Sequence, residues 1–206
     1  MTGPLHSDEV LGLLSQLATH INNPTLAGVF HDLPKRPEPA RPCQPRTLPV
    51  LAHLDAAVRS CPPASRAIME YLRRSCDALH WGQTYTADDL SPEFLASYGW
   101  TEFVGLRGPI PSEKVACGVL FLGPMTEYPS HSHQAEEVYV PLSGTALWQM
   151  GDGGWTRRQP LDVIHHQSWT PHAMRTGNDP LIALYLWRGG DLRQKSRLGN
   201  AAAPRA

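Results

Sequence analysis

The chain has 206 residues, of which 41% are hydrophobic, and its formal net charge is −1. This composition is sufficient for a packed core and argues against global disorder. Because no basic stripe is visible, we expect neither nucleic acid nor an anionic membrane as a partner.

The N-terminus and the cysteines bear on the compartment. The sequence begins MTGPLHSDEV, with no basic region and no long apolar run, so we expect no signal peptide and no membrane span. Cys43, Cys61, Cys76 and Cys117 show no C-x-x-C spacing and are expected to be free thiols. The sequence therefore predicts a cytoplasmic protein.

The first half of the chain is predicted to be helical. Apolar residues at helical spacing follow Ser7, a suitable N-cap, as far as the breaker Asn22-Asn23-Pro24. Six prolines between residues 34 and 49 indicate an extended connector. Further helices are expected at 50–58, after Pro62-Pro63, and at 91–98. Residues 1–98 are thus predicted to form an N-terminal helical subdomain.

After Trp100 the apolar pattern changes to the period of β-strands. Turn residues separate six short runs, which we expect to be strands at 102–106, 115–122, 137–142, 145–150, 161–165 and 181–187. Short strands at this spacing favour a β-sandwich or barrel. We place the barrel at residues 99–195 and expect a flexible tail at 196–206.

Two histidines and a glutamate stand at the start of one of these strands. His131 and His133 are two residues apart and share one face of an extended segment, as do Glu137 and Tyr139. A turn between the two pairs brings them together. Imidazole and carboxylate suit one divalent transition metal ion, such as Fe, Mn, Zn, Co or Ni.

The spacing H-x-H-x3-E-x6-G, from His131 to Gly144, resembles the first motif of the cupin family. The second cupin motif is matched mainly at His172, with His165 and His166 as alternative candidates. The resemblance implies a mainly β protein, with a cupin β-barrel (a double-stranded β-helix) and an N-terminal α-helical subdomain. It also implies His172 as a further metal ligand.

Longer segments are similar to the cupin-type dimethylsulfoniopropionate (DMSP) lyases. They include Tyr98-Gly-Trp100-Thr-Glu, Ala135-Glu-Glu137-Val-Tyr139-x-Pro-Leu-Ser-Gly144 and Pro171-His172-Ala-Met-Arg. The resemblance implies cleavage of DMSP to dimethyl sulfide, acrylate and a proton. It implies His133, Glu137 and His172 as metal ligands, with His131 coordinating or nearby, and Tyr128 and Tyr139 as catalytic residues.

The residues are compatible with a β-elimination, which needs a base for the proton next to the carboxylate. Free tyrosine has a pKa of about 10, and a nearby cation lowers it. Tyr139 shares a face with Glu137 and is the preferred base. Tyr128 is an alternative base, or it positions the carboxylate.

The substrate implied here is a zwitterion whose other end is a sulfonium cation, which aromatic faces attract. Tyr185, Trp187 and Trp148 are predicted to line its pocket, and Arg175 to assist the carboxylate. Two alternatives stay open: another metal-dependent cupin enzyme, such as an Fe-dependent dioxygenase or an isomerase, and a non-catalytic small-molecule-binding cupin. The helices could cap the barrel, act as a lid or form a homodimer contact.

Overall fold

The computed structural model describes residues 7–35 and 40–199. Its α-helices are α1 (Ser7–Ile21), α2 (Pro24–Phe30), α3 (Leu54–Ser60), α4 (Arg66–Ser75) and α5 (Pro92–Ala96). Short 3-10 helices cover Pro49–His53, Pro63–Ser65 and Cys76–Ala78. No helix in the described ranges is long and apolar enough to cross a membrane. Part of the predicted proline-rich connector and most of the predicted tail lie outside the described residues.

The segment predicted only as a helix breaker both ends one helix and starts the next. Asn22 has a φ of 50°, a left-handed conformation that closes α1. The Asn23 side chain then accepts hydrogen bonds from the backbone N–H groups of Thr25 and Leu26, and Pro24 occupies the first turn of α2. The sequence prediction missed α2 because the breaker was not also read as a cap.

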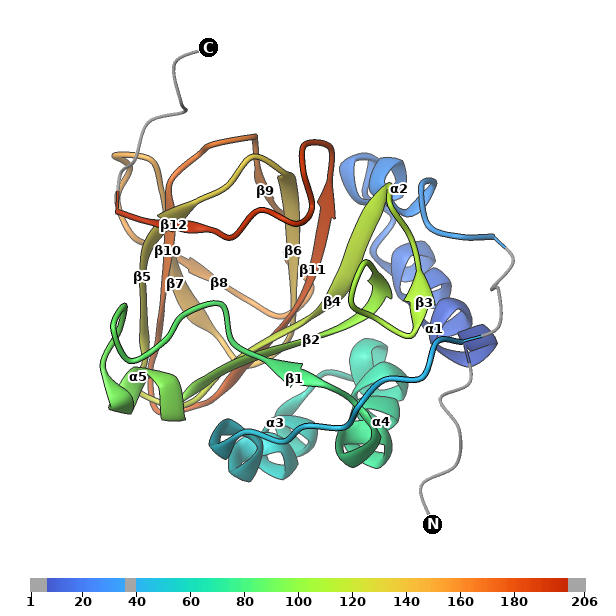
Figure 1. Ribbon diagram of the computed structural model, residues 1–206, viewed down its shortest axis with the longest axis horizontal. Helices are drawn as coiled ribbons and strands as arrows, with labels where there is room; N and C mark the ends of the chain where they lie inside the picture. The colour runs from blue at the N-terminus through green and yellow to red at the C-terminus, as the bar shows by residue number, and fades with distance from the viewer. Residues whose placement is uncertain (1–6, 36–39, 200–206) are drawn as a thin grey trace.

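Two sheets, antiparallel except for the pairing of β3 with β2, form a barrel (Figure 1). The larger sheet has the order β1-β2-β4-β11-β6-β9, with β3 beside β2, and the smaller one has the order β12-β5-β10-β7-β8. The strands of the larger sheet are β1 (Trp81–Gly82), β2 (Tyr98–Gly105), β3 (Ile110–Pro111), β4 (Val115–Leu122), β6 (Glu136–Ser143), β9 (Ile164–His166) and β11 (Leu181–Arg188). Those of the smaller sheet are β5 (Glu127–Ser132), β7 (Ala146–Met150), β8 (Thr156–Arg158), β10 (His172–Thr176) and β12 (Arg197–Leu198).

The two faces of the larger sheet have different partners. On β6, Val138, Val140 and Leu142 pack into a core that includes α1 to α4, whereas Tyr139 packs into the barrel interior. Figure 1 shows these helices along one side of the barrel. Because helices cover its outer face, the larger sheet is buried on both sides, and every residue of β4 is buried.

Hydrogen bonds fix the end of β6 to the helices. Ser143 donates to the backbone oxygen of Ala57 at 2.6 Å, and Ser65 donates to that of Leu142 at 2.6 Å. Gly144 follows with a φ of 79°, and a Cβ there would lie 2.1 Å from the backbone oxygen of Pro180, so only glycine fits. The helical segment therefore supports the strand that carries Glu137.

The predicted cupin barrel with N-terminal helices is confirmed, with differences at its edges. The strands β1, β3, β5, β8, β10 and β12 were not predicted. They are short or rich in polar and aromatic residues, so alternation is weak within them. At the start of the predicted tail, Arg197 and Leu198 pair with β5, because the main-chain groups at its edge accept another strand. The domain boundary at residue 98 stays a prediction.

Candidate metal centre and active-site cavity

Three buried side chains from separate parts of the barrel meet in its interior. His133 follows β5, Glu137 lies on β6, and His172 begins β10. One donor atom from each lies within 4.8 Å of the others, and all three side chains are at most 3% exposed. A buried group of two imidazoles and one carboxylate is a suitable donor set for a divalent ion.

The histidines are oriented so that both Nε2 atoms point toward the Glu137 carboxylate. Nδ1 of His133 lies 2.9 Å from the backbone oxygen of Ala135, and Nδ1 of His172 lies 2.9 Å from that of Thr170. A carbonyl only accepts, so each Nδ1 carries a proton, which leaves Nε2 as the atom that would bind an ion. Nε2 of His172 is buried 3.2 Å from Oε2 of Glu137 and makes no hydrogen bond within the described residues. The residues therefore fit a metal ion.

The Glu137 carboxylate lies at the centre of this group. Oε2 is 2.8 Å from Nε2 of His133, and Oε1 accepts a 2.5 Å hydrogen bond from the indole N–H of Trp187. Burial acts to raise the pKa of Glu137, but the charge and hydrogen bond of His133 hold it well below its ordinary value. Glu137 is therefore an ionised ligand candidate.

His131 lies beside the group without belonging to it. It pairs with His172 across β5 and β10, and the two rings are 4.2 Å apart. The His131 ring also stacks on the Tyr128 ring, with ring centroids 4.0 Å apart and an angle of 11° between the planes. Burial, and then the nearby His172, lower the pKa of His131 well below its ordinary value. A neutral ring in this position can support Tyr128 or approach an ion.

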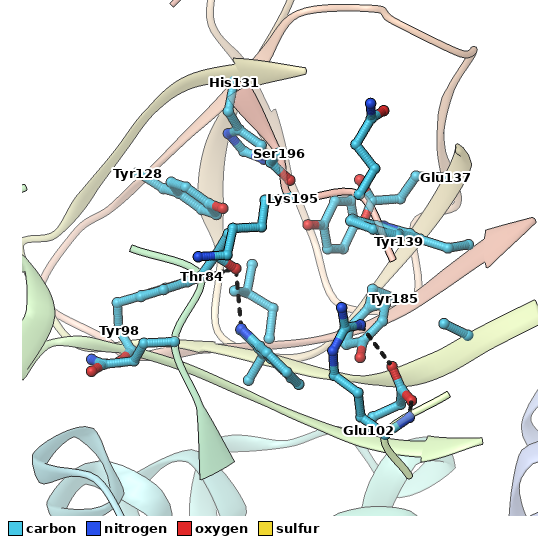
Figure 2. A pocket seen from close by; sticks show the side chains of 17 residues that line it. Thr84, Tyr98, Glu102, Tyr128, His131, Glu137, Tyr139, Tyr185, Lys195 and Ser196 are labelled. Carbon is cyan, nitrogen blue, oxygen red and sulfur yellow. Dashed lines mark hydrogen bonds and ion pairs between the residues drawn. The ribbon is translucent and has the colours of Figure 1, made fainter. Parts of the chain in front are cut away.

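The two candidate catalytic tyrosines face the interior from different strands. Figure 2 shows the hydroxyl ends of Tyr128 and Tyr139 pointing toward one another across the cavity. Burial, followed by the charge and hydrogen bond of Glu137, raises the pKa of Tyr139 well above 10. Burial, followed by Tyr98 and Tyr85, does the same for Tyr128, whose hydroxyl lies 3.2 Å from that of Tyr85. Neither phenol ionises here near neutral pH without an added positive charge.

A cavity of about 170 Å³ opens beside this group, between β2, β4 and β11 on one side and β5 on the other. Tyr128, His131, Glu137, Tyr139, Tyr185 and Trp187 all line it. Figure 2 shows Lys195 and Ser196, from the segment before β12, over the cavity. The cavity thus brings six of the predicted site residues together.

Sequence reasoning missed one wall of this cavity. Tyr98, Trp100 and Glu102 alternate along β2 and all line it. This segment is similar to the DMSP lyases, but the sequence pattern predicts a strand that begins only at residue 102. Period-two spacing from Tyr98 onward would have placed the three side chains on one face.

Glu102 is a buried carboxylate in this wall. One of its oxygens accepts hydrogen bonds from the backbone N–H groups of Arg107 and Gly108, at 2.5 and 2.8 Å. Burial raises the pKa of Glu102, and those backbone hydrogen bonds oppose the rise. The cavity therefore has acidic groups on two of its walls.

Two residues predicted to bind substrate lie elsewhere. Arg175 points out of the barrel, where it pairs with Glu127 at 2.7 Å and lies over the Trp155 ring. The reason is strand alternation, because the inward positions of β10 are His172 and Met174. Trp148 faces the interior but lies behind Tyr139, at 5.9 Å between ring centroids, and does not line this cavity.

The two alternative histidines take other positions. His165 points outward and contacts Glu136 at 2.7 Å. His166 is buried and stacks on His172, with ring centroids 4.1 Å apart and planes at 10°. Of the three histidines, only His172 has a donor atom in the group with His133 and Glu137.

The barrel and its buried His–Glu group define a cupin with a candidate mononuclear metal centre. The chain belongs to the dimethylsulfoniopropionate lyase family, whose model matches residues 22–183. The family prediction, and with it that of a carbon–sulfur lyase, is confirmed.

Individual relatives agree with this assignment. Dimethylsulfoniopropionate lyase DddQ of Ruegeria pomeroyi is 33% identical over 172 residues, which cover 84% of this chain and 85% of DddQ. A putative dimethylsulfoniopropionate lyase, DddL of Cereibacter sphaeroides, is 30% identical over 165 residues, covering 78% and 68%. The crystal structure of Ruegeria pomeroyi DddQ matches with a TM-score of 0.79 and 31% identity, over 91% of this chain and 96% of that one.

Proposed function

We propose that this protein cleaves DMSP to dimethyl sulfide and acrylate by a metal-dependent β-elimination with Tyr139 as the base. The main support is the position of Tyr139 in one buried cavity with Glu137, beside His133 and His172, in a member of this family. A Lewis acid beside a phenol is an arrangement suited to proton abstraction next to a carboxylate.

His133, Glu137 and His172 would hold the ion, and Fe, Mn, Zn, Co and Ni all suit this donor set. When bound, a divalent ion supplies Lewis acidity to a carboxylate and lowers the pKa of a nearby phenol. The raised pKa of Tyr139 in the protein alone means that its phenolate depends on such a charge.

In the proposed reaction the Tyr139 oxygen takes the proton from the carbon next to the carboxylate. The electron pair of that C–H bond forms the double bond of acrylate, and the C–S bond breaks with its pair going to sulfur. Sulfur loses its positive charge and leaves as neutral dimethyl sulfide. The proton on Tyr139 is then released to solvent, so atoms and charge balance.

Tyr128 has a second role in this proposal. Its hydroxyl faces the cavity and contacts that of Tyr85, while His131 stacks on its ring. A tyrosine fixed on both sides is suited to hold the substrate carboxylate by a hydrogen bond. Tyr128 is also the alternative base, because a proton taken there could pass to Tyr85.

We assign the sulfonium end of DMSP to the wall of the cavity opposite Tyr128. Tyr185 and Trp187 lie there with Trp100, and aromatic faces attract cations. The Glu102 carboxylate lies in the same wall, 4.0 Å from the Arg107 guanidinium. The aromatic faces would favour a substrate that carries a sulfonium cation over one with a neutral thioether. The four free cysteines are consistent with the further proposal that the protein works in the reducing cytoplasm.

The proposal is tested by anaerobic incubation of the metal-loaded protein with DMSP. We expect dimethyl sulfide in the headspace and an equal amount of acrylate in solution. A reaction that needs oxygen would instead indicate an oxygenase. No product above the uncatalysed rate, with metal bound, would overturn the proposed substrate.

A further inference from the structure

A second cavity, of about 240 Å³, lies on the other side of the barrel interior. It is found where β8, at the edge of the smaller sheet, faces β9, at the edge of the larger sheet. It shares no lining residue with the first cavity. His166 lines it and stacks on His172, so the second cavity lies directly behind the candidate metal ligands.

Buried polar atoms without partners gather in this cavity. Three side chains that line it have buried nitrogens with no hydrogen-bond partner in the described part of the chain: Nε1 of Trp148, Nε of Arg158 and both ring nitrogens of His166. His166 and Trp148 are only 1% and 3% exposed. Buried polar groups in folded proteins nearly always have a partner. Their grouping here therefore indicates that a bound ion or molecule in the cavity supplies their partners.

The side chains that line the cavity indicate the charge of the bound group. Arg158 is the one charged side chain in the lining and no carboxylate accompanies it. Its Nε has no hydrogen-bond partner within residues 7–35 and 40–199. Indole and guanidinium nitrogens only donate, and an imidazole has at least one N–H in either protonation state. The cavity thus offers three donors and a positive charge, which suits an anion.

The geometry points to a binding site for a small carboxylate monoanion in this cavity, held by Arg158, Trp148 and His166. The planar fork of a guanidinium matches the two oxygens of a carboxylate, and a single positive charge suits a monoanion. Gly153, Gly154 and Thr156 are exposed residues of the lining, so the site can be reached from the surface. This inference does not depend on the proposed reaction.

Acetate is the first probe. The melting temperature is measured as acetate replaces a bulky organic sulfonate at constant ionic strength, since a ligand of the folded state raises it with concentration. We expect a rise for the wild type that is lost in Arg158→Gln. Arg157→Gln is the matched control, because Arg157 lies on the same strand but is exposed and bonds Thr145. An equal acetate response in Arg158→Gln would overturn the site.

A second measurement does not depend on any variant folding. Wild-type crystals are soaked in bromide, a monoanion that anomalous diffraction locates. We expect a peak within hydrogen-bond distance of Arg158 Nε and Trp148 Nε1. Water alone in the cavity would refute the proposal. Neither readout involves turnover, so failure here is distinguishable from failure of the lyase assignment.

Discussion

The indole N–H of Trp187 donates a 2.5 Å hydrogen bond to Oε1 of Glu137, directly across the pairing of β11 with β6. The same indole ring lies 4.2 Å from the ring of His133. Trp187 was predicted only as part of a substrate pocket. Its contacts indicate that it also orients two of the three candidate ligands.

Trp187→Phe therefore tests a role in positioning the ligands. Phenylalanine keeps an aromatic ring beside His133 but removes the N–H. We expect metal affinity to fall by about 10- to 100-fold, as is usual when a group that orients a ligand is lost. Competition with a chelator measures this affinity. Trp155→Phe, at a site next to Arg175 on the barrel exterior, is the control, and equal affinities in both variants would rule out the positioning role.

Tyr139→Phe and Tyr128→Phe separate the two candidate bases. We expect Tyr139→Phe to keep its metal and to lose about 10²- to 10⁴-fold in kcat/KM, the usual contribution of a general base. Tyr128→Phe is expected mainly to raise KM. Tyr71→Phe, in the core between α4 and β2, controls for loss of a buried hydroxyl. If Tyr139→Phe stayed near wild type and Tyr128→Phe did not, the roles would have to be exchanged.

Metal content identifies the ligands. We expect His133→Ala, Glu137→Ala and His172→Ala each to bind much less metal per chain, because their donor atoms form the buried group. His131→Ala should lose less. The control is His165→Ala, at an outward-facing position. Elemental analysis after dialysis measures the content, and undiminished metal in any of the first three variants would remove that residue from the ligand set.

The stability of the metal-free protein should depend on His166. Burial, followed by His172, lowers the pKa of His166 to about 2, against about 6.5 in an unfolded chain. The unfolded state therefore binds more protons between these values, so stability is full above pH 6.5 and falls as the pH decreases toward 2. From pH 7 to 5 this one group should cost about 2 kcal/mol.

Urea unfolding at the two pH values measures this effect. We expect His166→Gln to lose less stability than wild type between pH 7 and pH 5, whatever its stability at pH 7. An identical loss in the two proteins would show that the imidazole is already charged or accessible in the folded state.

Two strands that carry the site, β6 and β11, were predictable because alternation determines which side chains share a face. Glu137 and Tyr139 lie on adjacent inward positions of β6, and Tyr185 and Trp187 do so on β11. The same rule places the Arg175 side chain outside the barrel, because Arg175 is one residue away from the inward position Met174. That prediction relied on proximity to His172 in sequence rather than on strand parity.

Other features depend on long-range packing that no local pattern reveals. The pairing of β5 with β10 brings His131 to His172, across 41 positions of the chain (172 − 131). Trp148 looked like a pocket residue from its strand position, but the fold places it behind Tyr139. A possible homodimer stays a prediction.

The most direct test of the proposed mechanism is a metal titration of activity. The protein is stripped with a chelator, and dimethyl sulfide release from DMSP is measured as a divalent metal is added back. We predict that activity is absent without metal and rises to a plateau at one ion per chain, as one group of His133, Glu137 and His172 requires. Full activity in the stripped protein would contradict the mechanism.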